Sequence, residues 1–125
     1  MVAADRLTAL ALVVGAVCLT VTGETFLKSG MNRVGTVEMG ALSAAASRAA
    51  RVPQLWIGFG FIGAGAILWL AALSRAPLSW AYPILSLGYV LVLFSARFIL
   101  HEPVSWQRWA GTLVIVGGLW LVFRS

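Results

Sequence analysis

The sequence predicts an all-α membrane protein with four transmembrane helices, and three observations lead to this fold class. Four stretches lack charged residues, and each approaches the roughly 20 residues that cross a hydrocarbon core of about 30 Å: 7–23, 52–74, 76–96 and 109–123. Hydrophobic residues make up 61% of the chain and charged residues 10%, whereas about 25% charged residues is usual in soluble domains. Unbroken apolar runs at 91–94 and 113–116 favour helices over the alternating strands of a membrane barrel.

The 125 residues are expected to form one four-helix transmembrane domain, 1–125. The first helix is predicted at about 7–32, because no strong helix breaker precedes Gly35. Asp5 beside Arg6, without a small-residue cleavage pattern, favours a retained helix over a cleaved signal peptide.

Proline residues mark the remaining helices. Pro53 suits the first turn of a helix at 53–74, because its missing N–H has no intrahelical partner there. A tight link containing Pro77 leads to a third helix, and Pro103 is expected to open the fourth. These two helices are predicted at 78–100 and 104–123.

The longest predicted loop covers 33–52. Its alanine-rich part, 39–48, indicates a short interfacial helix with Arg48 and Arg51 directed toward lipid headgroups.

Small residues four apart, as in Ala11/Gly15 and Gly60/Ala64, predict close helix packing inside the membrane. Because four short helices enclose little space for a substrate, we expect a dimer, either of this chain or with a similar chain. The glycines of the fourth helix, together with Trp120, favour a dimer seam there.

The net charge of +5 does not indicate nucleic-acid binding, because Lys and Arg lie singly near helix ends, where they suit anionic headgroups. Cys18 is the one cysteine and lies in an apolar run, which excludes an internal disulfide and a cysteine-based metal site. No cofactor and no metal are expected.

Ionisable residues inside spans are costly and by default mark a site. Glu24 and Lys28 are four apart in the first helix, with Thr20 and Asn32 on the same stripe. Either Glu24 and Lys28 neutralise each other near the interface, or the stripe lines a cleft that meets a charged substrate.

A second polar set lies on the third helix. Tyr82, Ser86, Tyr89 and Arg97 have spacings that keep them near one face. Tyr89 is equally consistent with an interfacial belt, and Arg97 either snorkels to the interface or faces the cleft.

Topology brings these sets together, because the first and third helices cross in the same direction. Their C-terminal ends carry Glu24 and Lys28, and Arg97 and His101, with Glu102 beside them. Cations gathered at one opening, with carboxylates among them, suit a phosphate whose attached group is itself cationic.

Four segments in the second half resemble a known family: Trp69-Leu70, Ala81–Leu87 (AYPILSL), His101–Ser105 (HEPVS) and Gly117-Gly118. The chain is similar to the small four-helix subunits of the aminoarabinose–phosphoundecaprenol flippase, in the drug/metabolite transporter superfamily, and more distantly to small multidrug resistance transporters. The first half matches only through Gly23 and Lys28. The resemblance implies a dimeric, multi-pass transporter of the bacterial inner membrane.

The chain departs from these relatives at three positions. Thr20 stands where small multidrug exporters carry a proton-coupling glutamate, and Leu85 where they carry a tryptophan. Glu24 stands where the flippase subunits more often carry an amide, and a carboxylate there would suit an amine-bearing headgroup.

We therefore expect a flippase that moves a polyprenyl-phosphate-linked amino sugar or a related anionic lipid headgroup. The expected substrate-binding residues are Glu24, Lys28, Tyr82, Ser86, Arg97, His101 and Glu102. A proton-coupled exporter of small cations, with Glu24 carrying the proton, and an accessory subunit of a related transporter are the alternatives. The spans hold no nucleophile–base pair, so no enzyme activity is expected.

Overall fold

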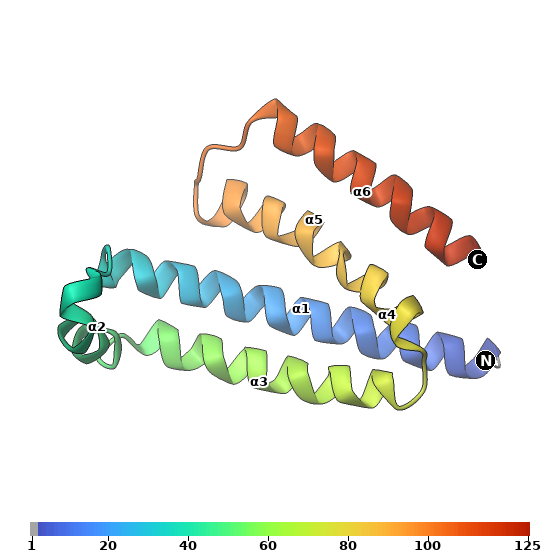
Figure 1. The fold of residues 1–125 in the computed structure, drawn as a ribbon, viewed down its shortest axis with the longest axis horizontal. Coiled ribbons are helices and arrows are strands. Elements are labelled where there is room, and N and C mark those ends of the chain that lie inside the picture. Colours follow the sequence, from blue (N-terminus) through green and yellow to red (C-terminus); the bar gives the residue numbers. More distant parts are fainter. Residues whose placement is uncertain (1–2) are drawn as a thin grey trace.

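The computed structural model describes residues 3–125, and its regular structure over that range is helical. Figure 1 shows α1 and α3 as a long antiparallel pair, with the later helices on the other side of α1. The elements are α1 (Ala3–Val34), η1 (Met39–Ala41), α2 (Leu42–Ala49), α3 (Pro53–Leu73), α4 (Leu78–Leu85), α5 (Leu87–Phe94), η2 (Ser95–Ile99) and α6 (Trp106–Arg124). The η1 segment is a 3-10 turn and η2 is a π-helix.

Three segments of the described chain are long and apolar enough to cross a membrane: Asp5–Val34, Pro53–Leu73 and Leu78–Ile99. They support the all-helical membrane class. The fourth predicted span corresponds to α6, whose 19 residues include Gln107 and Arg108 in the first turn. The apolar part of α6 is therefore shorter than the three candidate spans. That α6 also crosses the membrane stays a prediction.

Glycines let α1 and α3 approach closely. A Cβ atom on Gly23 would lie 2.6 Å from the carbonyl oxygen of Gly58, and one on Gly58 would lie 2.7 Å from that of Gly23. Gly60 has no such contact within this chain, because a Cβ atom there meets nothing within 4 Å. Close packing through glycine is present between α1 and α3, but it involves Gly23 and Gly58, and Gly60 is on the outer face of α3.

The third hydrophobic segment is divided into α4, α5 and η2, where one continuous helix at 78–100 was expected. Pro83 lies inside α4 and has no N–H to donate. At the junction, the N–H of Ser86 and its hydroxyl both donate to the carbonyl of Pro83. Further along, the N–H of Leu100 donates to the carbonyl of Ser95, five residues back, at the end of the π-helix.

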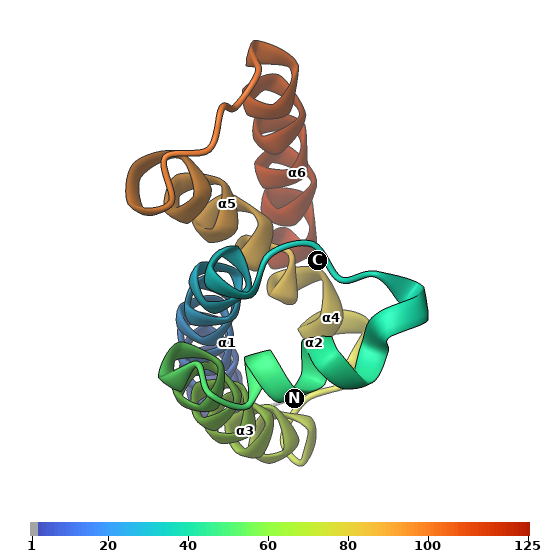
Figure 2. The same ribbon diagram turned by 90° about the vertical axis from the view of Figure 1, so that its left-hand side faces the viewer.

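The last helix begins later than expected. Pro103 was predicted to open it, but α6 starts at Trp106 with Ser105 as its N-cap, and the Ser105 hydroxyl accepts from the N–H of Arg108. A serine oxygen satisfies a free donor of the first turn, which proline cannot do. Only Leu119 of α6 is buried, and Figure 2 shows α6 beyond α5 and α4, away from α3.

The buried core lies toward the end of the molecule that holds the two termini. It joins residues of α1, the α3–α4 region and α6: Ala9, Val13, Val17, Ala72, Ala76, Trp80, Ala81, Ile84 and Leu119. At the same end, Arg6 donates to the main-chain oxygen of Ser125 at 3.1 Å. The opposite end holds α2 and the loop between η2 and α6 (Figure 1). The polar residues predicted for the site lie between the core and that end.

Candidate functional site

A pocket of about 350 Å³ lies between α1 and the α4–α5 segment. This headgroup pocket, as we call it below, is lined by Val17, Thr20, Val21, Glu24, Tyr82, Leu85, Ser86, Gly88, Tyr89 and Val92. The break between α4 and α5 falls at Ser86, so the pocket opens where the proline-containing helix ends. Glu24 is the only Asp, Glu, Lys or Arg in this lining.

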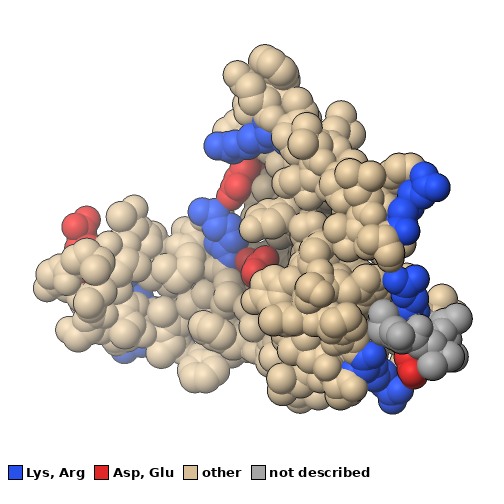
Figure 3. Space-filling model, turned by 45° about the vertical axis from the view of Figure 1, so that its right-hand side comes forward, with Lys and Arg blue, Asp and Glu red and all other residues tan. Residues whose placement is uncertain are grey.

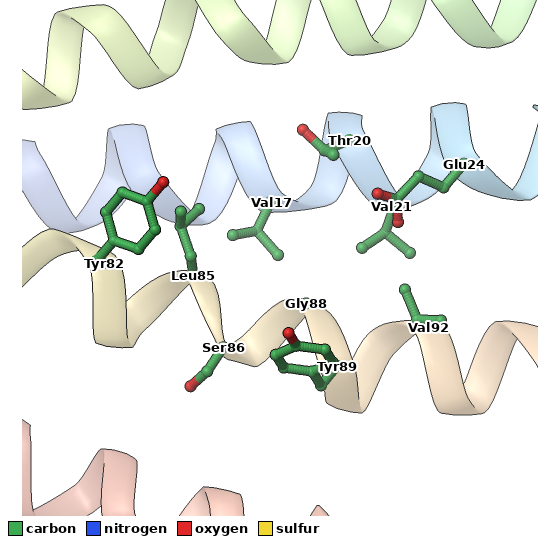
Figure 4. Close-up of a pocket in the computed structure, with 10 residues that line it drawn as sticks. All are labelled: Val17, Thr20, Val21, Glu24, Tyr82, Leu85, Ser86, Gly88, Tyr89 and Val92. Atoms are coloured by element: carbon green, nitrogen blue, oxygen red, sulfur yellow. The ribbon is translucent and has the colours of Figure 1, made fainter.

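The polar groups of the headgroup pocket come from both walls. Figure 4 shows Thr20 and Glu24 on α1, and Tyr82 reaching from α4 toward α1. The Tyr82 ring packs edge-on against Trp69 of α3, with ring centroids 5.5 Å apart, which fixes its direction. The Ser86 hydroxyl points away from α1 in the same view and is already bonded to the Pro83 carbonyl.

Lys28 lies outside the headgroup pocket, one helical turn beyond Glu24. Its Nζ atom is 3.8 Å from Oε1 of Glu102, in the loop that precedes α6, and the two side chains are 54% and 38% exposed. The interpretation that Glu24 and Lys28 neutralise each other is not what the described residues show, because the ion pair of Lys28 is with Glu102. Figure 3 shows acidic and basic side chains close together in a recess, while the other charged side chains of this view lie toward the two sides of the molecule.

Arg97 and His101 do not line this pocket. The Arg97 guanidinium lies over the ring of Phe98 at 5.8 Å, and the side chain is exposed. His101 has a φ of 56°, a left-handed conformation that turns the chain after η2. The structure thus gathers Glu24, Tyr82 and Ser86 around one pocket and pairs Lys28 with Glu102, while Arg97 and His101 lie apart from the pocket.

A second pocket of about 650 Å³ was not anticipated from the sequence. This apolar groove runs between α1 and the α5–η2 segment, lined by Cys18, Val21, Thr22, Thr25, Phe26, Ser29, Leu91, Phe94, Ser95, Phe98, Ile99 and Leu100. Ser95 was the available signal, because it is a small polar residue inside an apolar run. Its hydroxyl lies 2.6 Å from that of Thr25, and this hydrogen bond links the two walls.

Within residues 3–125, no group of three His, Cys, Asp or Glu side chains is placed so that it could hold a metal ion.

Comparison with known proteins identifies relatives over most of the chain. The sequence profile of the EamA-like transporter family matches residues 7–124. A Pseudomonas aeruginosa (strain PAO1) protein named "Probable 4-amino-4-deoxy-L-arabinose-phosphoundecaprenol flippase subunit ArnE" is 41% identical over 81% of this chain and 92% of its own. A Pseudomonas fluorescens (strain Pf0-1) protein of the same name is 45% identical over 61% of this chain and 67% of its own. No solved structure gives a significant match.

These matches confirm the resemblance to flippase subunits that the second half of the sequence indicates.

Proposed function

Because this chain belongs to the EamA-like transporter family, we propose that it moves a polyprenyl-phosphate-linked amino sugar, or a related anionic lipid headgroup, across the bacterial inner membrane. The names of its relatives support this substrate class. The observation that carries the proposal is the headgroup pocket, which combines one carboxylate with hydroxyl groups and has a lysine one helical turn further along α1.

The two ends of such a headgroup differ in charge, and so do the two parts of the site. Glu24 suits the protonated amine of an amino sugar, and the hydroxyls of Tyr82 and Tyr89 suit the sugar ring. Lys28 suits the phosphate, as a point charge. An amine in the pocket would thus place the phosphate toward the α2 end of the molecule.

Glu102 has a specific role in this scheme. Without substrate, its carboxylate pairs with Lys28, and the phosphate would take its place. An exposed pair of this kind contributes only roughly 0.2–1 kcal/mol, so the exchange has a low cost. Arg97 and His101, at the same end of the molecule, would contact the phosphate or neighbouring lipid headgroups.

We further propose four membrane spans in one domain, with α6 as the fourth, and a dimer of this chain or a pair with a similar chain. The relatives are named as subunits, and α6 leaves most of its surface uncovered. A partner packed there would complete the enclosure of the pathway. The role is transport, and no catalytic step is assigned to any residue.

Proton-coupled export of small cations is the second candidate. It is favoured by one observation, which is that the headgroup pocket has a carboxylate and no Lys or Arg in its lining. Proton-driven uptake of an organic cation by lipid vesicles containing the protein, abolished by Glu24→Gln, would support this function over lipid transport.

Mass spectrometry of lipids retained by the purified protein tests the leading proposal. We expect the parent protein to retain a polyprenyl phosphate, Lys28→Ala to lose it, and Arg97→Ala to retain less. Arg75→Ala is the matched control, because Arg75 is exposed in the α3–α4 link at the opposite end. A parent protein that retains no polyprenyl phosphate would contradict the proposal.

A further inference from the structure

The geometry points to the apolar groove as the binding site for the polyprenyl chain of the lipid whose headgroup enters the headgroup pocket. This inference rests on the proposed function. It assigns the larger pocket, about 650 Å³, which lies within the size range of small-molecule sites.

The two pockets meet along α1. Val21 lines both of them. Lys28 follows Val21 by seven residues, or about two helical turns, so it lies on the same line of the helix. Glu24 in the headgroup pocket and Thr25 in the apolar groove precede Lys28 by four and three residues, the spacings of neighbours on a helix surface. A phosphate at Lys28 would thus have one pocket on each side, as a phosphate between a sugar and a hydrocarbon chain requires.

The lining of the apolar groove suits hydrocarbon. The hydroxyl of Thr22 donates to the carbonyl of Cys18, and that of Thr25 bonds to Val21 and Ser95. These polar groups are therefore satisfied within the protein and need no polar ligand. Most of the remaining surface is aliphatic or aromatic.

The aromatic rings in the lining of the apolar groove favour an unsaturated, methyl-branched hydrocarbon chain over a polar ligand. Phe94 and Phe98 are stacked with centroids 6.0 Å apart, and Phe26 contributes from the opposite wall. Cys18 and Ser29 mark the extremes of the α1 wall, about 16 Å apart at the rise of an α-helix. The groove is long enough to hold several carbons of the chain next to the phosphate, while the rest stays in the bilayer.

Filling the groove tests this assignment. Ile99 lines it and is 64% exposed; Ile67 on α3 is 69% exposed and lines neither pocket. We expect Ile99→Trp to weaken binding of undecaprenyl phosphate by at least about tenfold, and Ile67→Trp to leave it unchanged. Binding of aminoarabinose phosphate without a lipid chain should be equal in both. Cys18→Phe is a second groove-filling variant, should Ile99→Trp fail to fold.

Photo-crosslinking identifies the occupant directly. p-Benzoylphenylalanine in place of Phe98, an exposed aromatic residue of the groove lining, should capture undecaprenyl phosphate added to vesicles of phosphatidylethanolamine and phosphatidylglycerol, whereas the same residue in place of exposed Leu113 on α6 should not. Equal capture of phosphatidylglycerol at position 98 would overturn the assignment. Undiminished binding to both groove-filling variants would overturn it while leaving the proposed function intact. A parent protein that binds aminoarabinose phosphate but no undecaprenyl phosphate would instead refute the proposed lipid substrate.

Discussion

Replacement of Gly23 by alanine should loosen the contact between α1 and α3. The added Cβ atom would lie 2.6 Å from the carbonyl oxygen of Gly58 and 2.7 Å from Cγ1 of Ile62. Ordinary van der Waals contact begins near 3.4 Å, so the helices must separate by about 0.8 Å. Because one obstacle is backbone, side-chain rotation cannot relieve it. Overpacking of this kind typically costs about 1–3 kcal/mol.

The assay is equilibrium unfolding of the detergent-solubilised protein by dodecyl sulfate, followed by far-ultraviolet circular dichroism. The matched control is Gly60→Ala, on α3, where an added Cβ atom meets nothing within 4 Å. We expect the control to leave the free energy of unfolding unchanged or to raise it by up to about 1 kcal/mol, because alanine favours a helix over glycine. Equal effects of the two variants would refute the close approach of α1 and α3 at Gly23.

Three further predictions concern the site and its supports. Glu102→Lys should increase retention of polyprenyl phosphate, recorded by lipid mass spectrometry, because it removes the carboxylate that competes for Lys28 and adds a second cation beside the phosphate; unchanged or lower retention would contradict the displacement of Glu102 by phosphate. The double exchange Lys28→Glu with Glu102→Lys should keep the ion pair but lose lipid retention. Thr25→Val should lower the free energy of unfolding by roughly 1 kcal/mol, measured by dodecyl sulfate titration, because the hydroxyl of Ser95, which is 8% exposed, loses its partner; an unchanged value would show that this bond does not contribute. Pro83→Ala should supply an N–H for the hydrogen bonds within α4 and reduce lipid binding severalfold without a loss of stability, because the break at Ser86 shapes the headgroup pocket. Unaltered lipid binding would contradict that role.

The sequence was sufficient to predict the helical membrane class because apolar runs and proline positions are local signals. It could not predict which face of a helix meets a neighbour. Gly58 and Gly60 are two residues apart, yet only Gly58 contacts α1. A Gly-containing pattern is compatible with either face until the neighbouring helix is placed.

The candidate site was predictable in part for the same reason. Helical spacing placed Glu24 and Tyr82 on inward faces, and both line the headgroup pocket. Local spacing also suggested Glu24 as the partner of Lys28, but the partner is Glu102, which is 74 residues away in sequence and reaches Lys28 through the loop before α6. The apolar groove depends on the π-helix at 95–99, for which the residues give no simple pattern.

The most direct test of the proposed site, in which Glu24 binds the amine and Lys28 the phosphate, compares two lipids that differ in headgroup charge. Binding of aminoarabinose-phosphoundecaprenol and of its N-formyl derivative, which lacks the positive charge, would be measured for the parent protein and for Glu24→Gln. We expect the parent to prefer the free amine by about tenfold or more and Glu24→Gln to bind the two lipids equally. The same preference in both proteins would contradict the assignment of Glu24 to the amine.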